Sequence, residues 1–267
     1  MRVPGRGSNV RGRVTQRSAV GEDRAIARRG KRRAINYLVT CEHGGNQIPP
    51  AYRSLFRHRR RLLNTHRGYD PGALGMARTL ARALSAPLVA STVSRLLIEL
   101  NRSPGHPQLY SEGMRGAPPA IRDEVYARFY LPYRAAVEAT VRTIVARRGS
   151  VIHLSSHSFT PQLDGVVRNA DIGLLYDPSR PGEVALCARW QAALRSRAPA
   201  WVVRRNYPYT GKSDGLTAYL RRRFAPDAYI GVELEINQKH VFGEPRSWAR
   251  MRSTIVAALR EAIVNTA

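Results

Sequence analysis

Histidine side chains that could bind a metal ion occur next to short apolar runs in this sequence. His43 follows the run at 35–40 and precedes two glycines, so it is either a metal-binding residue or an exposed residue of a tight turn. If the run that begins at Val151 is a strand, His153 and His157 share one face of it, with His157 at the end. A buried imidazole needs a partner, and a metal ion is one. We therefore expect His157 to be a ligand and His153 to be structural.

Carboxylates in apolar or strand-end positions are the second group of candidates. Asp70 precedes a proline, where an aspartate is by default the N-cap of a helix but could instead be a metal ligand at the mouth of a sheet. Glu233 and Glu235 lie on the same side of an otherwise apolar run. A carboxylate in such a run is costly unless it is paired or functional, so a glutamate there could be a general base whose pKa is raised by burial.

An arginine completes the set. Arg95 lies four residues before Glu99 and is either a surface residue or a guanidinium that grips a carboxylate through two parallel hydrogen bonds. Two histidines, one or two carboxylates and an arginine are the groups that a zinc hydrolase needs, namely three protein ligands, an open position for water and a nearby base. A polar loop at 206–211 follows a further apolar run.

The elements that must position these residues alternate between strand and helix. Helical patterns begin at Asp70-Pro71, span 119–148 with a break at Pro132, and recur at 183–195 and 248–264. The alternation predicts one α/β domain over residues 34–267 with a largely parallel sheet, whose sites lie at the carboxyl ends of its strands. The predicted strands are Ile35–Thr40, Pro87–Ser91, Leu96–Leu100, Val151–Ser155, Ile172–Tyr176, Trp201–Arg204 and Tyr229–Leu234.

Composition restricts the class of protein. The 267 residues include 44 Lys+Arg and 19 Asp+Glu, a net charge of +25. Residues 1–33 carry eleven basic and two acidic residues, or 11 − 2 = +9, and little that could form a core, so we predict a disordered basic arm. It lacks the apolar stretch of an obvious secretory signal, which leaves a basic tether, an Arg-rich organelle-targeting peptide or an extension without function. No apolar run approaches the roughly 20 residues of a membrane helix. Two cysteines are too few for a disulfide scaffold or a four-cysteine zinc site.

Taken in order, the motifs resemble those of the N-formylglutamate amidohydrolase family, over about residues 35–245. The matching segments are Glu42-His43-Gly44-Gly45-Asn46-Gln47-Ile48-Pro49, Tyr69-Asp70-Pro71-Gly72-Ala73, Arg95 with Glu99-Leu100-Asn101-Arg102, Leu131-Pro132-Tyr133, His153-Leu154-Ser155-Ser156-His157-Ser158-Phe159, Asp171-Ile172-Gly173, Asn206-Tyr207-Pro208-Tyr209-Thr210-Gly211 and Glu233-Leu234-Glu235-Ile236-Asn237-Gln238.

The resemblance implies a three-layer α/β/α fold with a mixed, mostly parallel sheet, similar to zinc carboxypeptidases and aspartoacylases. It implies Zn²⁺ as the cofactor, with His43 and His157 as ligands. The carboxypeptidase relatives use His-x-x-Glu, whereas here the fourth position is Asn46, a poor zinc ligand beside a carboxylate. The third ligand must then come from elsewhere, and we expect Asp70. The resemblance also implies Glu235 as the general base.

The expected reaction is hydrolysis of N-formyl-L-glutamate to formate and glutamate, in a cytoplasmic enzyme of histidine degradation. The implied substrate-binding residues are Asn101 and Arg102, which would receive a carboxylate, with Asn206 and Gly211 of the polar loop. Arg95 is expected to stabilise the oxyanion. The expected partner is a small anionic N-acyl amino acid, which a positive field would attract.

Two alternatives remain open on the sequence. One is a zinc hydrolase of another amide or peptide, which would keep the same metal site. The other is a basic nucleic-acid-binding protein, with the basic arm as the only segment that favours contact with nucleic acid.

Overall fold

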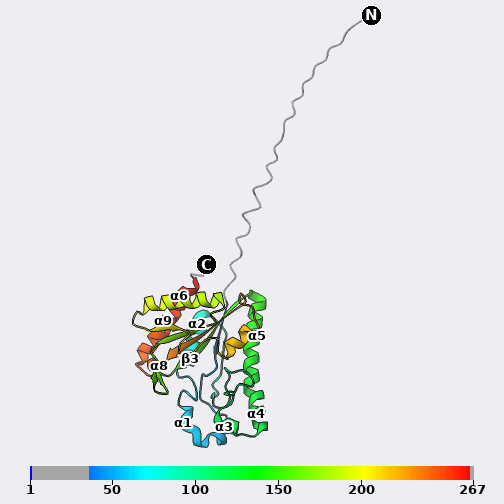
Figure 1. Ribbon diagram of the computed structural model, residues 1–267, viewed down its shortest axis with the longest axis vertical. Helices are drawn as coiled ribbons and strands as arrows, with labels where there is room; N and C mark the ends of the chain where they lie inside the picture. Colours follow the sequence, from blue (N-terminus) through cyan, green and yellow to red (C-terminus); the bar gives the residue numbers. More distant parts are fainter. Residues whose placement is uncertain (2–35, 265–267) are drawn as a thin grey trace. The chain divides into compact units, whose positions relative to one another are not determined.

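A six-stranded mixed sheet lies at the centre of the computed structural model, which describes residue 1 and residues 36–264 (Figure 1). Counted from the edge strand Leu88–Ala90, the first four strands are parallel, the fifth runs antiparallel to the fourth, and the sixth is parallel to the fifth. The predicted mixed, mostly parallel sheet is confirmed, whereas the predicted arm, apart from Met1, lies outside the described residues. In spatial order the strands are β2 (Leu88–Ala90), β1 (Tyr37–Cys41), β3 (Val151–Phe159), β8 (Tyr229–Asn237), β6 (Ile172–Leu175) and β7 (Val203–Arg205).

Helices cover both faces of this sheet, which makes the three layers. On one face α2 (Ala73–Leu84), α6 (Pro181–Arg197) and α9 (Pro245–Val264) bury a large apolar cluster. On the other face α5 (Leu131–Arg148) and α7 (Leu216–Arg221) bury a second cluster (Figure 1). No helix among the described residues has the length and apolar character needed to cross a bilayer.

The predicted helical stretch 119–148 is one run with a wider turn inside it. The turn precedes Pro132, which has no N–H to donate into the preceding turn, so the helix widens there instead of ending. The run consists of α4 (Pro119–Val125), a π-helical turn (Tyr126–Tyr130) and α5. The remaining elements are the 3-10 helix Pro50–Arg59, α1 (Arg60–Leu63), α3 (Glu112–Arg115), α8 (Gln238–Val241) and the hairpin of β4 (Gln162–Leu163) and β5 (Val166–Val167).

The predicted strand Leu96–Leu100 is wrong, because this segment is a buried loop. Its backbone forms a turn-type hydrogen bond from Leu97 N–H to Ser94 O at 2.9 Å and a longer-range one from Glu99 N–H to Leu109 O at 2.9 Å. Its leucines are buried in the cluster beneath α5. A short apolar run indicates burial, but periodicity alone does not tell a strand from another buried segment.

Side-chain alternation on β3 and β8 brings polar residues together on one face of the sheet. Ser155 pairs in register with Glu233, and His157 with Glu235. Since successive side chains of a strand point to opposite faces, these four lie on the α5 side, toward the carboxyl ends of β3 and β8. The alternate residues of these two strands point to the opposite face and belong to the apolar cluster under α2, α6 and α9. They include Leu154, Val232, Leu234 and Ile236.

Candidate active site

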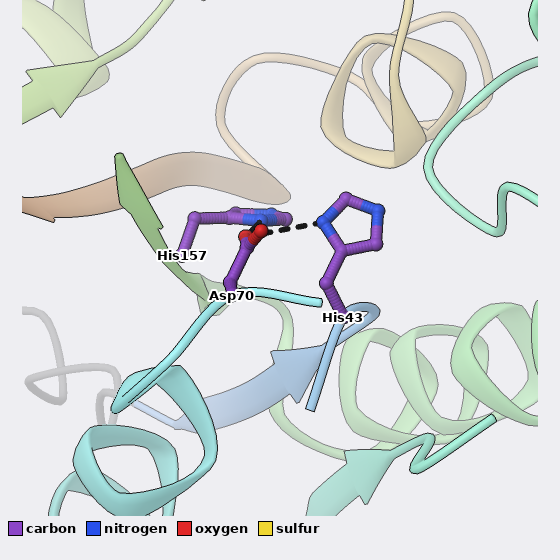
Figure 2. Close-up of side chains that lie close together, drawn as sticks. All are labelled: His43, Asp70 and His157. Atoms are coloured by element: carbon purple, nitrogen blue, oxygen red, sulfur yellow. Dashed lines mark hydrogen bonds and ion pairs between the residues drawn. The ribbon is translucent and has the colours of Figure 1, made fainter. Parts of the chain in front are cut away.

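Three candidate metal ligands from separate chain segments converge at the end of the sheet. His43 follows β1, Asp70 precedes α2, and His157 lies on β3. Asp70 Oδ2 is 3.1 Å from His43 Nδ1 and 3.0 Å from His157 Nδ1, and Figure 2 shows its carboxylate directed at both rings. One potential ligand atom from each residue lies within 4.8 Å of the others, and all three residues are buried. The alternative of an exposed turn for His43 is therefore wrong.

The two distances from Asp70 fit a small divalent cation. A tetrahedral ion with ligand bonds of about 2.0–2.2 Å holds its ligand atoms roughly 3.3 Å apart, close to both Asp70 distances. Two imidazole nitrogens and one carboxylate oxygen are also a donor set found at catalytic zinc sites. The residues present could therefore hold zinc.

The other ring nitrogen of each histidine contacts a second carboxylate. His157 Nε2 is 3.0 Å from Glu42 Oε2, and His43 Nε2 donates to Glu99 Oε1. Such carboxylates orient metal-binding imidazoles and increase their basicity. Sequence reasoning named both glutamates without assigning them this role. The sequence offered one sign of this role, namely that Glu42 adjoins His43 and that Glu99 lies near the end of an apolar run.

Glu42 remains ionised although it is completely buried. Burial by itself would raise the pKa of Glu42, but the hydrogen bond and charge of His157, with the hydroxyl of Ser155 at 2.6 Å, outweigh it and hold the pKa far below its usual range. Tyr133 donates to the other carboxylate oxygen at 2.8 Å. Burial opposes the charge on His157 as well, yet Asp70 and Glu42 raise the pKa of this imidazole well above its ordinary value. The cluster thus stabilises positive charge where a cation would bind.

Replacing Glu42 by Gln is expected to weaken metal binding about 10- to 100-fold, because His157 loses the carboxylate that orients it. Competition between the protein and a chromophoric chelator for zinc measures the change. Glu124→Gln, which alters an exposed ion pair with Arg128, is the matched control and should leave the affinity unchanged. Equal affinities for the Glu42 variant and the parent protein would contradict this role.

Asp70 is not a helix N-cap, contrary to the default interpretation of Asp-Pro. Helix α2 begins at Ala73, with Gly72 as its N-cap at φ 80°, which leaves the Asp70 carboxylate free to point into the site. Ser158 Oγ donates to Pro71 O at 2.7 Å, and Asp70 N–H donates to His43 O at 3.0 Å. These bonds fix the loop against β3 and against the His43 segment.

Arg95 binds protein carboxylates. Its Nε donates to Glu99 Oε2 at 2.7 Å, and its Nη1 donates to Asp70 Oδ1 at 3.3 Å. Of the two interpretations of Arg95, the grip on a carboxylate is the one present, with Glu99 as the partner, so Arg95 is not a solitary surface arginine. It also lines the cavity above the candidate ligands, where we had expected it to stabilise an oxyanion.

The glycines after His43 permit a close approach of backbone to backbone. A Cβ on Gly44 would lie 2.7 Å from Ser91 O, and one on Gly45 would lie 2.6 Å from Thr92 O. Asn46 is not one of the grouped candidate ligands, and its Nδ2 donates to Asn64 Oδ1 at 2.9 Å. The turn that presents His43 therefore rests against segment 91–94.

Glu235 lies in the same cavity, of about 180 Å³, as the three candidate ligands. Its Oε2 is buried and has no hydrogen-bond partner among the residues that the structure describes. Burial raises the pKa of Glu235 to about 8, with a smaller contribution from the charge of Asp70. An unpartnered carboxylate beside His157 is placed as a general base requires.

Asn101 and Arg102 line the same cavity. Asn101 Oδ1 accepts from Leu216 N–H at 2.7 Å, at the start of α7. Arg102 Nη1 donates to Asp214 O, which leaves further N–H groups of its guanidinium for a ligand. Both predicted carboxylate receivers are thus brought to the cavity.

Comparison with known proteins agrees with this arrangement. A model of the N-formylglutamate amidohydrolase family matches residues 35–242. The chain belongs to this family. It is therefore a hydrolase of non-peptide C–N bonds, and the resemblance found in the motifs is confirmed.

The solved structures that are similar to this amidohydrolase chain include the following two. A gene product of Agrobacterium tumefaciens is 29% identical, with a TM-score of 0.75 and coverage of 86% of this chain and 91% of that chain. The N-formylglutamate amidohydrolase from Ralstonia eutropha JMP134 is 21% identical, with a TM-score of 0.60 and coverage of 86% and 94%, and supports the fold. A search of curated proteins finds no match.

Two predicted substrate-binding residues of the amidohydrolase lie behind the cavity wall. Asn206 Oδ1 accepts from the N–H groups of Tyr176 and Gly211, both at 3.0 Å, and a Cβ on Gly211 would lie 2.2 Å from Tyr176 N. Neither residue is among those lining the cavity. They shape the loop that carries Tyr209 and Thr210 to it.

His153 is structural, as expected, because both ring nitrogens have protein partners. Thr40 Oγ1 is 2.8 Å from Nε2, and the Tyr229 hydroxyl is 2.7 Å from Nδ1. Burial is the main cause that lowers the pKa of His153 to about 4.

Because His153 stays neutral in the folded protein, we expect the free energy of unfolding to decrease as the pH falls. Between pH 6.5 and 4 the unfolded chain binds a proton that folded His153 excludes, so its contribution to the free energy of unfolding falls by up to about 3 kcal/mol as the pH decreases. Urea unfolding of the protein and of His153→Gln across this pH range measures the effect. The variant should lose less stability on acidification, and parallel curves would disprove the assignment.

Proposed function

We propose that this chain is a zinc-dependent amidohydrolase that cleaves the acyl amide of an N-acyl amino acid such as N-formyl-L-glutamate, yielding formate and glutamate. The observation that carries the proposal is one cavity that unites His43, Asp70 and His157 with the unpartnered carboxylate of Glu235. Imidazole nitrogens with one carboxylate favour zinc over magnesium or calcium, which prefer oxygen ligands.

The metal, when bound, supplies a Lewis acid that activates water and polarises the scissile carbonyl. Glu235 takes the proton of the attacking water and passes it to the leaving amine, a task suited to a buried carboxylate of raised pKa. Arg102 and Asn101 hold the substrate carboxylate and so orient the amide toward Glu235.

The hydrogen bonds of Arg95 refine its proposed role. Its guanidinium is shared between Asp70 and Glu99, so it chiefly holds those carboxylates in place around the histidines. The remaining N–H groups can still face a developing oxyanion, because Arg95 lines the cavity.

The size of the cavity supports a small substrate. Its volume of about 180 Å³ is below the roughly 300–1,000 Å³ of sites for drug-sized ligands. A formylated amino acid is of suitable size, whereas a folded polypeptide cannot enter.

Removal of the metal tests the proposal. The purified protein is treated with a chelator, its zinc is quantified, and formate release from N-formyl-L-glutamate is measured before and after zinc is restored. We expect activity to disappear with the metal and to return at about one zinc ion per chain. Full activity in the verified metal-free protein would refute the proposal.

A further inference from the structure

Three polar side chains around the start of α5 lie behind the wall of the active-site cavity. They are Tyr130, Tyr133 and Arg134, which are all buried and are not among the residues that line the cavity. Residues three and four positions apart lie on one face of a helix, so this spacing directs all three side chains to the same side. That face of the helix contacts two separate parts of the site.

Tyr133 contacts the carboxylate that orients one of the candidate metal ligands. Its hydroxyl lies 2.8 Å from Glu42 Oε1 and 3.3 Å from Val89 O, so its single proton goes to the nearer carboxylate oxygen. The other oxygen of Glu42 is 3.0 Å from His157 Nε2, and His157 Nδ1 lies 3.0 Å from Asp70 Oδ2. A chain of contacts thus runs from α5 through Glu42 to a ligand of the metal position.

Tyr130 and Arg134 contact the segment that carries the candidate carboxylate receivers. The Tyr130 hydroxyl donates to Arg102 O at 2.6 Å, and Arg134 Nη1 donates to Leu100 O at 3.2 Å. These two bonds lie on either side of Asn101. They hold the backbone from which the side chains of Asn101 and Arg102 reach the cavity.

The π-helical turn before α5 determines which face of the helix meets the site. A π turn holds about one residue more than an α turn, which rotates every later side chain by roughly 100° about the helix axis relative to an uninterrupted α-helix. The turn Tyr126–Tyr130 directly precedes α5, so it sets the direction of Tyr133 and Arg134 relative to α4. Such turns occur frequently at functional sites.

We propose that Tyr133 and Tyr130 are positioning residues with two separate tasks. Tyr133 holds Glu42, and through it His157, in place for the metal, whereas Tyr130 holds Arg102 in place for the substrate carboxylate. The inference rests on the proposed function, in which those residues bind zinc and substrate. Because the two phenols act on different parts of the site, their removal should change different constants.

Tyr133→Phe is expected to weaken zinc binding about 3- to 10-fold, because Glu42 loses the phenol that fixes it beside His157. Competition with a chromophoric chelator measures this affinity without reference to activity. At saturating zinc the KM for N-formyl-L-glutamate should equal that of the parent protein, since Tyr133 does not contact the segment of the carboxylate receivers.

Tyr130→Phe is expected to raise the KM for N-formyl-L-glutamate about 3- to 10-fold at unchanged kcat, because the backbone of Arg102 loses its anchor. Zinc affinity should stay the same, since Glu99 beside His43 is held separately by Arg95 at 2.7 Å.

The matched control is Tyr126→Phe in the same π-helical turn. The Tyr126 ring stacks on that of Tyr130 with 4.8 Å between ring centres, but its hydroxyl forms no hydrogen bond with any residue that the structure describes. Both constants should therefore equal those of the parent protein. Every variant is measured at a temperature at which circular dichroism shows it to be folded, since loss of a buried hydroxyl also lowers stability.

The separation of the two constants is the readout that a merely structural role would not produce. Equal changes of zinc affinity and KM in the two variants, or lowered stability with both constants unchanged, would overturn the proposal. If N-formyl-L-glutamate is not hydrolysed, the proposed function fails, and calorimetric binding of this compound replaces KM. Weaker binding to Tyr130→Phe alone then supports the role of Tyr130, and absent or unchanged binding overturns it. Zinc affinity still decides the role of Tyr133, which a parent protein unable to bind zinc would overturn.

Discussion

Glu235→Gln is expected to lower kcat for N-formyl-L-glutamate about 10²- to 10⁴-fold while the protein retains its zinc. Glutamine has nearly the same shape but cannot accept the proton of the attacking water. The buried Oε2 has no hydrogen-bond partner within the described part of the chain, so little of the structure described there depends on its charge. Steady-state kinetics together with metal analysis measures the effect. Glu261→Gln on the surface of α9 is the control, since it alters only an exposed pair with Arg197.

We also expect Glu235→Gln to change the dependence of kcat/KM on pH. A base acts when deprotonated, so kcat/KM should increase with pH through the pKa of Glu235. Burial moves this pKa from 4.5 to about 8, and the charge of a bound cation acts in the opposite direction, so the acid limb should lie between these values. The residual activity of Glu235→Gln should lack this limb. An unchanged rate and profile would exclude Glu235 as the base.

Asp70→Asn is expected to weaken zinc binding by more than about 100-fold and to abolish hydrolysis at stoichiometric zinc. An amide oxygen is a poorer ligand than a carboxylate, and its dipole does not balance the positive charge of the cation. Titration with a zinc chelator and the formate assay measure the two effects.

A stability measurement distinguishes ligation from a purely structural role of Asp70. The metal-free variant should unfold at a lower temperature than the metal-free parent, because the buried carboxylate pairs with His43, His157 and Arg95, so zinc affinity is compared at a temperature at which both proteins are folded. A variant that kept zinc and activity but lost stability would show that Asp70 only supports the helix start.

Much of the sheet could be predicted because its determinants are local. Apolar runs alternating with amphipathic segments predicted β1, β3 and β8 with modest errors at their ends, and the period of two on β3 placed His153 and His157 on one face. The run 96–100 has the same local character but is a buried loop, because hydrogen bonds to residues outside the run determine its backbone. Pattern therefore indicated burial better than it indicated conformation.

The sequence by itself determined the family and which side chains could do chemistry, because residue types and their order are sufficient for both. Only the tertiary structure decided that Asp70 joins His43 and His157, that Glu42 and Glu99 hold the two rings, and that Asn206 and Gly211 lie behind the cavity. The bonds around the cavity join residues as far as 115 positions apart in the chain, as in the one between Leu216 and Asn101. They depend on strand register and on loop packing against distant segments, and no local propensity encodes either.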